Sequence, residues 1–144
     1  MWTIGHGAGS FTDLEQRIAP LGISMIVDVR SQPYSGHAPD FTRRRLEELS
    51  EEAGVGYRWL GTTLGGKPDD GPVGPERPGF GESIEELIEW ADSTPTVILC
   101  AELEPDSCHR STIIGNALDE RGIDVRHILG DGSTRPHEPP LPFS

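Results

Sequence analysis

Residues 96–100 read TVILC and form the apolar run that decides the fold. A continuous apolar run of this length is typical of a strand that is buried on both faces of a parallel sheet. Residues 25–29, MIVDV, repeat the pattern with Asp28 as the one charged member. We therefore predict that both runs lie inside a sheet that helices cover on each side.

Segments with helical spacing alternate with strand-like runs along the chain. Phe11, Leu14 and Ile18 recur at the spacing of one helix face, and Ser10 with Asp13 resembles a capping box before them. The expected strands are 2–4, 25–29, 55–60, 96–100 and 124–129, and the expected helices are 10–22, 40–53, 83–91 and 106–122. This order predicts a single three-layer α/β domain over residues 1–129, with a mostly parallel sheet of about five strands and flanking helices.

Two segments lack the pattern of a packed element. Residues 61–80 are dense in Gly and Pro, which is typical of a functional or mobile connection, and we interpret them as a lid over a ligand. Residues 130–144 are rich in Pro, and we predict a disordered C-terminal tail.

Composition limits the classes of partner. The 144 residues carry a formal net charge of -12. An acidic surface repels phosphate backbones, so we expect no general nucleic-acid binding, whereas a local basic pocket for a small anion is compatible with it. No run approaches the ~18 apolar residues of a membrane span, and the chain shows no signal-peptide pattern. We therefore expect no membrane partner and a cytoplasmic location with free thiols.

The candidate site follows from the predicted topology. Ligands of open α/β sheets bind beyond the carboxyl ends of the strands, so residues that follow the strands are expected to meet at one edge. The chemically informative residues at these positions are His6, Asp28, Arg30, Ser31, Gly65, Gly66, Lys67, Cys100, Glu102, Cys108, His109 and Arg110.

Arg30 and Arg110 are the cations expected to bind a ligand. A guanidinium at the end of a strand suits bidentate binding of phosphate or carboxylate, and for Arg30 the alternative is an internal ion pair with Asp28 or Glu102. Asp28 is interpreted either as a general base or as a structural carboxylate. His6 lies between two glycines and is either a proton-transfer group or a turn residue exposed to water.

The two cysteines receive different interpretations. Cys100 ends an apolar strand and is expected to pack in the core. Cys108 lies at a predicted helix start beside Arg110, where the helix dipole and the arginine favour a thiolate, so it is the candidate nucleophile; packing at the helix start is the alternative. A zinc site or a redox pair built from Cys100, Cys108, His109 and His6 is disfavoured, because the sequence contains no C-x₂-C pair.

Four motifs in order make the chain resemble the family catalogued as domain of unknown function 488: TIGHG, VDVRSQPYS, YRWLGTTLGGKP and LCAELEPDSCHRSTI. The resemblance runs from Thr3 to about Ile128 and implies a small α/β fold without assigning a reaction. It also marks Gly5 and Pro33 as motif positions beside the candidate residues above. Many relatives carry arginine where this chain has Lys67, and that difference implies weaker bidentate anion binding.

These observations predict an enzyme, a hydrolase or transferase, that acts on a phosphate-bearing or nucleotide-like small molecule. Cys108, His6 and Asp28 are the candidate catalytic residues. The candidate ligand-binding residues are Arg30, Ser31, Gly65, Gly66, Lys67, Glu102, His109 and Arg110. Two other classes stay open, namely a noncatalytic anion-binding or interaction module and a metal or thiol redox protein, and the sequence indicates no cofactor.

Overall fold

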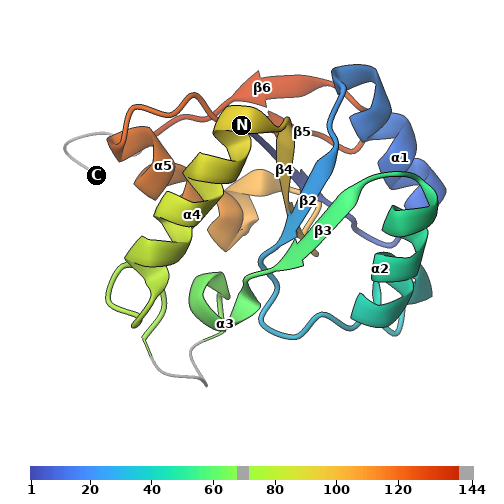
Figure 1. Ribbon diagram of the computed structural model, residues 1–144, viewed down its shortest axis with the longest axis horizontal. Coiled ribbons are helices and arrows are strands. Elements are labelled where there is room, and N and C mark those ends of the chain that lie inside the picture. The colour runs from blue at the N-terminus through green and yellow to red at the C-terminus, as the bar shows by residue number, and fades with distance from the viewer. Residues whose placement is uncertain (68–71, 140–144) are drawn as a thin grey trace.

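The computed structural model describes residues 1–67 and 72–139 and contains a six-stranded sheet (Figure 1). The strands are β1 (Trp2–Gly5), β2 (Met25–Asp28), β3 (Gly56–Trp59), β4 (Thr96–Cys100), β5 (Arg126–Ile128) and β6 (Thr134–Pro136). Their spatial order is β3-β2-β4-β1-β5-β6, and every pair is parallel except β5 with β6. The predicted α/β fold with a mostly parallel sheet is confirmed, and β6 is added to it.

Helices cover both faces of the sheet (Figure 1). On one face lie α1 (Phe11–Ile18) and α2 (Arg43–Glu52), and on the other lie α4 (Phe80–Ser93) and α5 (Asn116–Glu120). Ser10 caps α1 in the predicted capping box with Asp13. The shorter elements are η1 (Ala19–Leu21), η2 (Pro39–Phe41), α3 (Gly61–Leu64), η4 (Pro105–Ser107) and the π-helical turn η5 (Arg110–Gly115). No described helix has the length and apolar character needed to cross a membrane.

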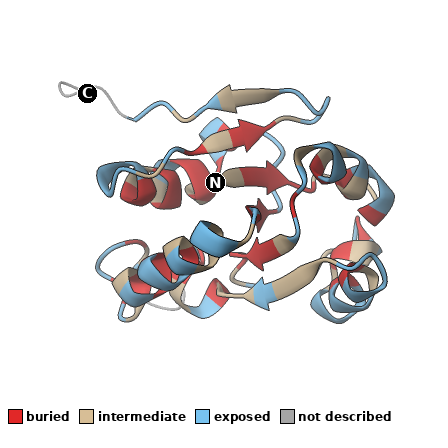
Figure 2. Cartoon of the chain, turned by 45° about the horizontal axis from the view of Figure 1, so that its top comes forward, coloured by how far each residue is buried: buried red, intermediate tan, exposed pale blue. Residues whose placement is uncertain are grey.

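Each face of the sheet has its own hydrophobic core. Within β4, Leu99 packs with α1 and α2, whereas its neighbour Ile98 packs with α4 and α5. Ile26 and Val27 divide between the two cores in the same way on β2. Because successive side chains of a strand point to opposite faces, a strand covered on both sides needs an unbroken apolar run. Figure 2 shows the resulting buried residues along the central strands.

The chain reverses its direction across the sheet between β2 and β4. Helix α2 connects β2 to β3, which lies at one edge of the sheet. Helix α5 lies in the connection from β4 to β5, which is on the other side of β1. The two connections leave the carboxyl ends of neighbouring strands toward opposite faces. A crevice therefore opens between them, which is where open α/β sheets bind ligands.

The expected disordered tail is wrong for the part that the structure describes. Residues Thr134–Pro136 form β6, which pairs antiparallel with β5. The backbone N–H of His137 then donates to the carbonyl of Val125 at 2.8 Å. The high Pro content suggested disorder, but Pro is compatible with an edge strand when it lies at the end of that strand. Composition alone therefore does not reveal these hydrogen bonds between strands. Residues 140–144 of the predicted tail lie outside the described residues.

The segment interpreted as a lid is tied down where it is described. The buried guanidinium of Arg77 donates to the carbonyl oxygens of Pro72, Gly65 and Lys67 at 2.6, 3.1 and 2.9 Å. Three hydrogen bonds from one buried cation fix the loop on both sides of the residues that the structure leaves out, which are 68–71. Arg77 could not be identified from the sequence, because one arginine in a Gly/Pro-rich loop carries no spacing signal.

Candidate functional site

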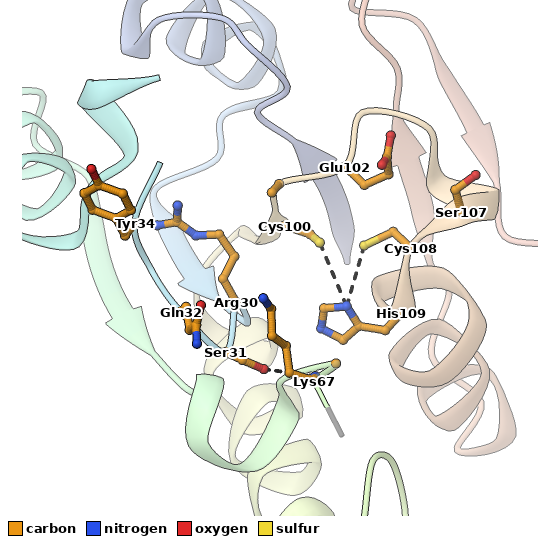
Figure 3. A pocket seen from close by; sticks show the side chains of 12 residues that line it. Arg30, Ser31, Gln32, Tyr34, Lys67, Cys100, Glu102, Ser107, Cys108 and His109 are labelled. Atoms are coloured by element: carbon orange, nitrogen blue, oxygen red, sulfur yellow. Dashed lines mark hydrogen bonds between the residues drawn. The ribbon is translucent and has the colours of Figure 1, made fainter. Parts of the chain in front are cut away.

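A cavity of about 460 Å³ lies at the carboxyl ends of β2 and β4, and we call it the edge pocket (Figure 3). Its walls come from the residues after β2, the loop after α3 and the connection from β4 to η5. The lining residues are Arg30, Ser31, Gln32, Tyr34, Gly66, Lys67, Cys100, Ala101, Glu102, Ser107, Cys108 and His109. Most of the predicted site residues therefore line one cavity, whereas His6, Asp28, Gly65 and Arg110 lie outside its lining.

Two sulfur atoms and one imidazole meet on a wall of the edge pocket, and we call Cys100, Cys108 and His109 the sulfur–imidazole cluster. The Nδ1 atom of His109 lies 3.9 Å from Sγ of Cys100 and 3.7 Å from Sγ of Cys108. All three atoms lie within 4.8 Å of one another, and both cysteines are free and buried. Figure 3 shows both sulfurs turned toward the ring.

The ring of His109 is held in one orientation by its surroundings. Its Nε2 lies 3.2 Å from the carbonyl oxygen of Val29, and since a carbonyl only accepts, Nε2 carries the hydrogen. The lone pair of Nδ1 in the neutral imidazole therefore faces the two sulfurs. A Cβ atom on Gly66 would lie 2.8 Å from Nδ1 of this ring. The close approach of the loop to the ring explains why glycine occupies this position.

The electrostatics of the cluster correct the interpretation of the cysteines. A hydrogen bond from the S–H group of Cys108 lowers the pKa of Cys100 despite its burial. The pKa of Cys108 is raised, first by that hydrogen bond to Cys100 and then by burial. Cys100 is therefore more than a packing residue, because its sulfur interacts with that of Cys108 on the wall of the edge pocket. Cys108 does lie where a helical segment begins, because its backbone is extended as at an N-cap, with φ -124 and ψ 142, and its carbonyl accepts from the backbone N–H of Thr112 at 3.1 Å. Its Sγ accepts from the backbone N–H of Arg110 at 3.5 Å.

Arg30 lines the edge pocket but is held in an internal ion pair. Its Nε and Nη2 donate to the two carboxylate oxygens of Asp28 at 2.8 and 2.7 Å, and its Nη1 donates to the Phe41 carbonyl at 2.6 Å. Asp28 is fully buried and also accepts from the hydroxyl of Tyr57 at 2.5 Å. Burial, and next the charge of Asp28, raise the pKa of Tyr57. The structural alternatives for Asp28 and Arg30 therefore describe them best, and Asp28 is not placed to act as a general base in the pocket.

His6 is buried rather than exposed in a turn. Its ring stacks on Phe41 with centroids 4.2 Å apart, and its Nδ1 lies 2.6 Å from the carbonyl oxygen of Gly7. Burial lowers its pKa, which leaves the ring neutral at pH 7. Its Nε2 faces Nη1 of Arg30 at 3.4 Å. His6 therefore supports Arg30 from behind, away from the edge pocket.

Arg110 has a structural position that differs from the predicted anion-binding role. It is fully buried, and its guanidinium donates to the carbonyl oxygens of Glu102 and Leu103, and to Oγ1 of Thr3 at 3.2 Å. These contacts shape the loop after β4 from the inside. The prediction paired Arg110 with Arg30 across the edge, but its donors face the backbone because η5 turns its side chain inward.

The remaining predicted residues lie near the mouth of the edge pocket. The hydroxyl of Ser31 accepts from the backbone N–H of Lys67 at 3.2 Å, and a Cβ atom on Gly65 would lie 2.1 Å from that hydroxyl oxygen. Lys67 is exposed, and its side chain extends between Arg30 and His109 (Figure 3). Glu102 is exposed, and its carboxylate turns away from the two sulfurs (Figure 3).

A chain of hydrogen bonds connects two histidines, a threonine and an asparagine that the sequence alone does not relate to one another. Thr3 Oγ1 lies 2.5 Å from Nδ1 of His127, whose Nε2 lies 3.0 Å from Nδ1 of His137. Nε2 of His137 lies 2.7 Å from Oδ1 of Asn116. The chain is complete with both histidines neutral, because each ring then donates from Nε2 and accepts at Nδ1. No motif links these residues, which come from four separate parts of the chain.

The cluster can perform two kinds of chemistry. A thiolate beside an imidazole can act as a nucleophile, with the imidazole moving the proton. Two sulfurs and one imidazole nitrogen are also ligands for a soft metal ion. Both uses need access from the edge pocket, which Cys100, Cys108 and His109 all line.

Residues 14–78 match the family described as Domain of unknown function DUF488. The match confirms the resemblance that the motifs indicate, over the part of the chain from α1 to just before α4. The sulfur–imidazole cluster follows in β4 and the connection to η5, beyond the matched residues. No curated protein and no solved structure matches this sequence.

Proposed function

We propose that this chain, with its DUF488 segment, is an enzyme that binds a small anionic molecule in the edge pocket and acts on it there. The observation that carries the proposal is the shared lining of one cavity of about 460 Å³ by reactive groups and by cations. The sulfur–imidazole cluster forms one wall, and Arg30 and Lys67 contribute to another (Figure 3). The reaction class is that of a hydrolase or transferase.

The charge of the lining supports an anionic ligand. Among the residues that the structure describes, the edge pocket is lined by two cations, Arg30 and Lys67, and by one carboxylate, Glu102, in a chain whose net charge is -12. Because Asp28 neutralises Arg30, Lys67 is the cation available to a ligand. The hydroxyl hydrogen of Ser31 is a second donor, since its oxygen accepts from the Lys67 backbone.

Replacing Lys67 with glutamine is expected to weaken binding of an anion. A charge-assisted hydrogen bond contributes about 1.5–3 kcal/mol, so the dissociation constant should rise roughly 10- to 100-fold. Isothermal titration calorimetry with inorganic phosphate, adenosine monophosphate and glucose 6-phosphate measures it. Arg44→Gln is the matched control, because it removes one positive charge from an exposed position on α2. Equal affinities for the two variants would contradict the proposal.

The sulfur–imidazole cluster favours an enzyme over a noncatalytic anion-binding module. A pocket that only binds an anion gains nothing from two sulfurs and an imidazole on its wall. Turnover of p-nitrophenyl phosphate and p-nitrophenyl acetate by the wild type, lost in Cys100→Ser, is the expected result. Anion binding that depends on Lys67 without any turnover would instead assign the chain to the module class.

A further inference from the structure

We infer that the sulfur–imidazole cluster is a zinc site, with Cys100, Cys108 and His109 as protein ligands and a fourth position open to the edge pocket. Within the described part of the chain, these residues form the one group of three or more metal-ligating side chains whose donor atoms all come within 4.8 Å of one another. The inference deepens the proposed function and rests on it for the role of the open position. The three-residue site itself rests on geometry alone.

The distances between the donor atoms fit tetrahedral zinc. Bonds of about 2.3 Å to sulfur and 2.0–2.1 Å to nitrogen, at a tetrahedral angle, separate the two donors by roughly 3.6 Å. The observed distances from Nδ1 of His109 are 3.7 Å to Cys108 and 3.9 Å to Cys100. The two sulfurs lie within 4.8 Å of each other, and tetrahedral zinc would separate them by about 3.8 Å, so adjustments of the side chains bring all three donors to one ion.

Neighbouring groups orient the donor atoms of the cluster, as the outer-shell partners of a metal site orient its ligands. His109 gives its Nε2 hydrogen to the Val29 carbonyl at 3.2 Å, which presents Nδ1 to the metal position. A ligating histidine ordinarily donates its other ring hydrogen to a carbonyl or carboxylate in this way. The backbone N–H of Arg110 also donates to Sγ of Cys108 at 3.5 Å. Gly66 packs against the ring, so the loop after α3 holds the imidazole in place.

The donor set selects the kind of metal. Thiolate ligands favour Zn²⁺ and Cu⁺ over Mg²⁺ or Ca²⁺, which prefer oxygen donors. A site with three protein ligands and one open position is the arrangement of catalytic zinc, and two cysteines with one histidine are among its known donor sets. The low spacing signal in the sequence is no obstacle, because Cys100 ends β4 while Cys108 and His109 precede η5.

A zinc ion here would complete the anion site of the proposed function. The open position faces a cavity that Lys67 and Arg30 also line, so a bound anion can contact the metal and the ammonium together. Metal-bound oxygen ligands are polarised by the ion, which acts as a Lewis acid. The cation also offsets the negative charge of the thiolate ligands.

The test is the zinc content and cobalt spectrum of the full chain prepared without a tag. Plasma mass spectrometry of protein purified without chelator is expected to give close to one zinc per chain. Titration of chelator-treated protein with Co²⁺ is expected to produce thiolate-to-cobalt charge-transfer absorption. Wild-type protein with only trace zinc and no charge-transfer absorption would overturn the inference.

Variants then assign the ligands. Cys100→Ser, Cys108→Ser and His109→Gln should each weaken zinc binding by more than the roughly 10- to 100-fold that loss of an outer-shell partner costs. His37→Gln is the matched control for His109→Gln, because His37 is exposed on the loop after β2. Gly66→Ala should weaken zinc binding by displacing the ring. Ligand variants that keep wild-type affinity would overturn the assignment.

The two proposals fail in different ways. Zinc binding measured without any anion tests the metal site alone, and phosphate binding by Lys67→Gln tests the anion site. Stoichiometric zinc with no anion binding would contradict the proposed function and support the zinc site. Anion binding that depends on Lys67 in a protein without zinc would do the reverse.

Discussion

Replacing Arg30 with methionine is expected to lower the free energy of unfolding by about 3–5 kcal/mol, as removal of one partner of a buried ion pair does. Arg30 is 5% exposed and Asp28 0%, and two side-chain nitrogens of Arg30 contact the carboxylate. Without the guanidinium, Asp28 keeps the hydroxyl of Tyr57 and one backbone N–H as donors. The carboxylate would then be buried with its charge unbalanced.

Urea denaturation followed by circular dichroism measures this loss. Arg44→Met is the control, because Arg44 is exposed on α2 and its replacement should change stability by no more than about 0.5 kcal/mol. Adding Asp28→Asn to Arg30→Met should recover part of the loss, since the second change removes the unbalanced charge. A loss no larger than that of the control would show that Arg30 serves the pocket and not the fold.

Lowering the pH from 6.5 to 4 is expected to cost about 2.5 kcal/mol of stability through His127 alone. His127 is 2% exposed, and its burial, followed by the charges of His137 and Arg110, lowers its pKa to about 4. The unfolded chain takes up the proton near the ordinary histidine pKa of about 6.5, whereas the folded chain resists it until about pH 4. Stability is therefore present above pH 6.5 and is lost as the pH falls toward 4.

The hydrogen-bond chain around His127 helps to explain why this histidine stays neutral in the folded protein. Protonated His127 would carry a hydrogen on Nδ1, so that nitrogen could no longer accept from the hydroxyl of Thr3, and its charge would be buried near the guanidinium of Arg110. Burial lowers the pKa of His137 as well, so its contribution has the same sign. Protonation of either ring would therefore loosen the contact between β5 and the segment after β6.

Stability measured at several pH values isolates this effect from that of the carboxylates. His127→Gln should flatten the dependence of unfolding free energy on pH between 6.5 and 4, although it lowers stability at pH 7. His37→Gln should leave the dependence unchanged, because His37 is exposed and belongs to no such chain. An identical pH dependence in wild type and His127→Gln would show that the buried histidine does not control acid stability.

The fold could be predicted because its signals are local. TVILC and MIVDV are continuous apolar runs because their strands are covered on both faces, and α1 begins at its predicted capping box. β6 could not be predicted because it forms through its hydrogen bonds to β5. Residues 134–136 themselves show no apolar run or alternation that would indicate a strand. Helix 106–122 was wrong in detail, since η4, an extended Cys108 and η5 replace its first half.

The candidate site could be predicted in position but not in roles. The carboxyl-edge rule selected Arg30, Lys67, Cys100, Cys108 and His109, which line the edge pocket. It also selected His6, Asp28, Gly65 and Arg110, which lie outside that lining. Arg30 and Arg110 were both expected to hold an anion, and the structure turns them toward Asp28 and toward backbone carbonyls. A residue type shows what a side chain can bind, whereas its partners depend on segments distant in sequence.

The sequence by itself determined the alternation of strands and helices, the acidic charge and the edge at which polar residues gather. Those properties depend on periodicity and on residues near in the chain, which are readable without coordinates. Only the tertiary structure decided that both sulfurs face one imidazole. Cys100 ends β4, whereas Cys108 follows the separate turn η4. The ring of His109 is oriented by Gly66 and by the carbonyl of Val29, the residue that follows β2. Those contacts cross three segments, so no spacing rule within the segment 96–113 contains them.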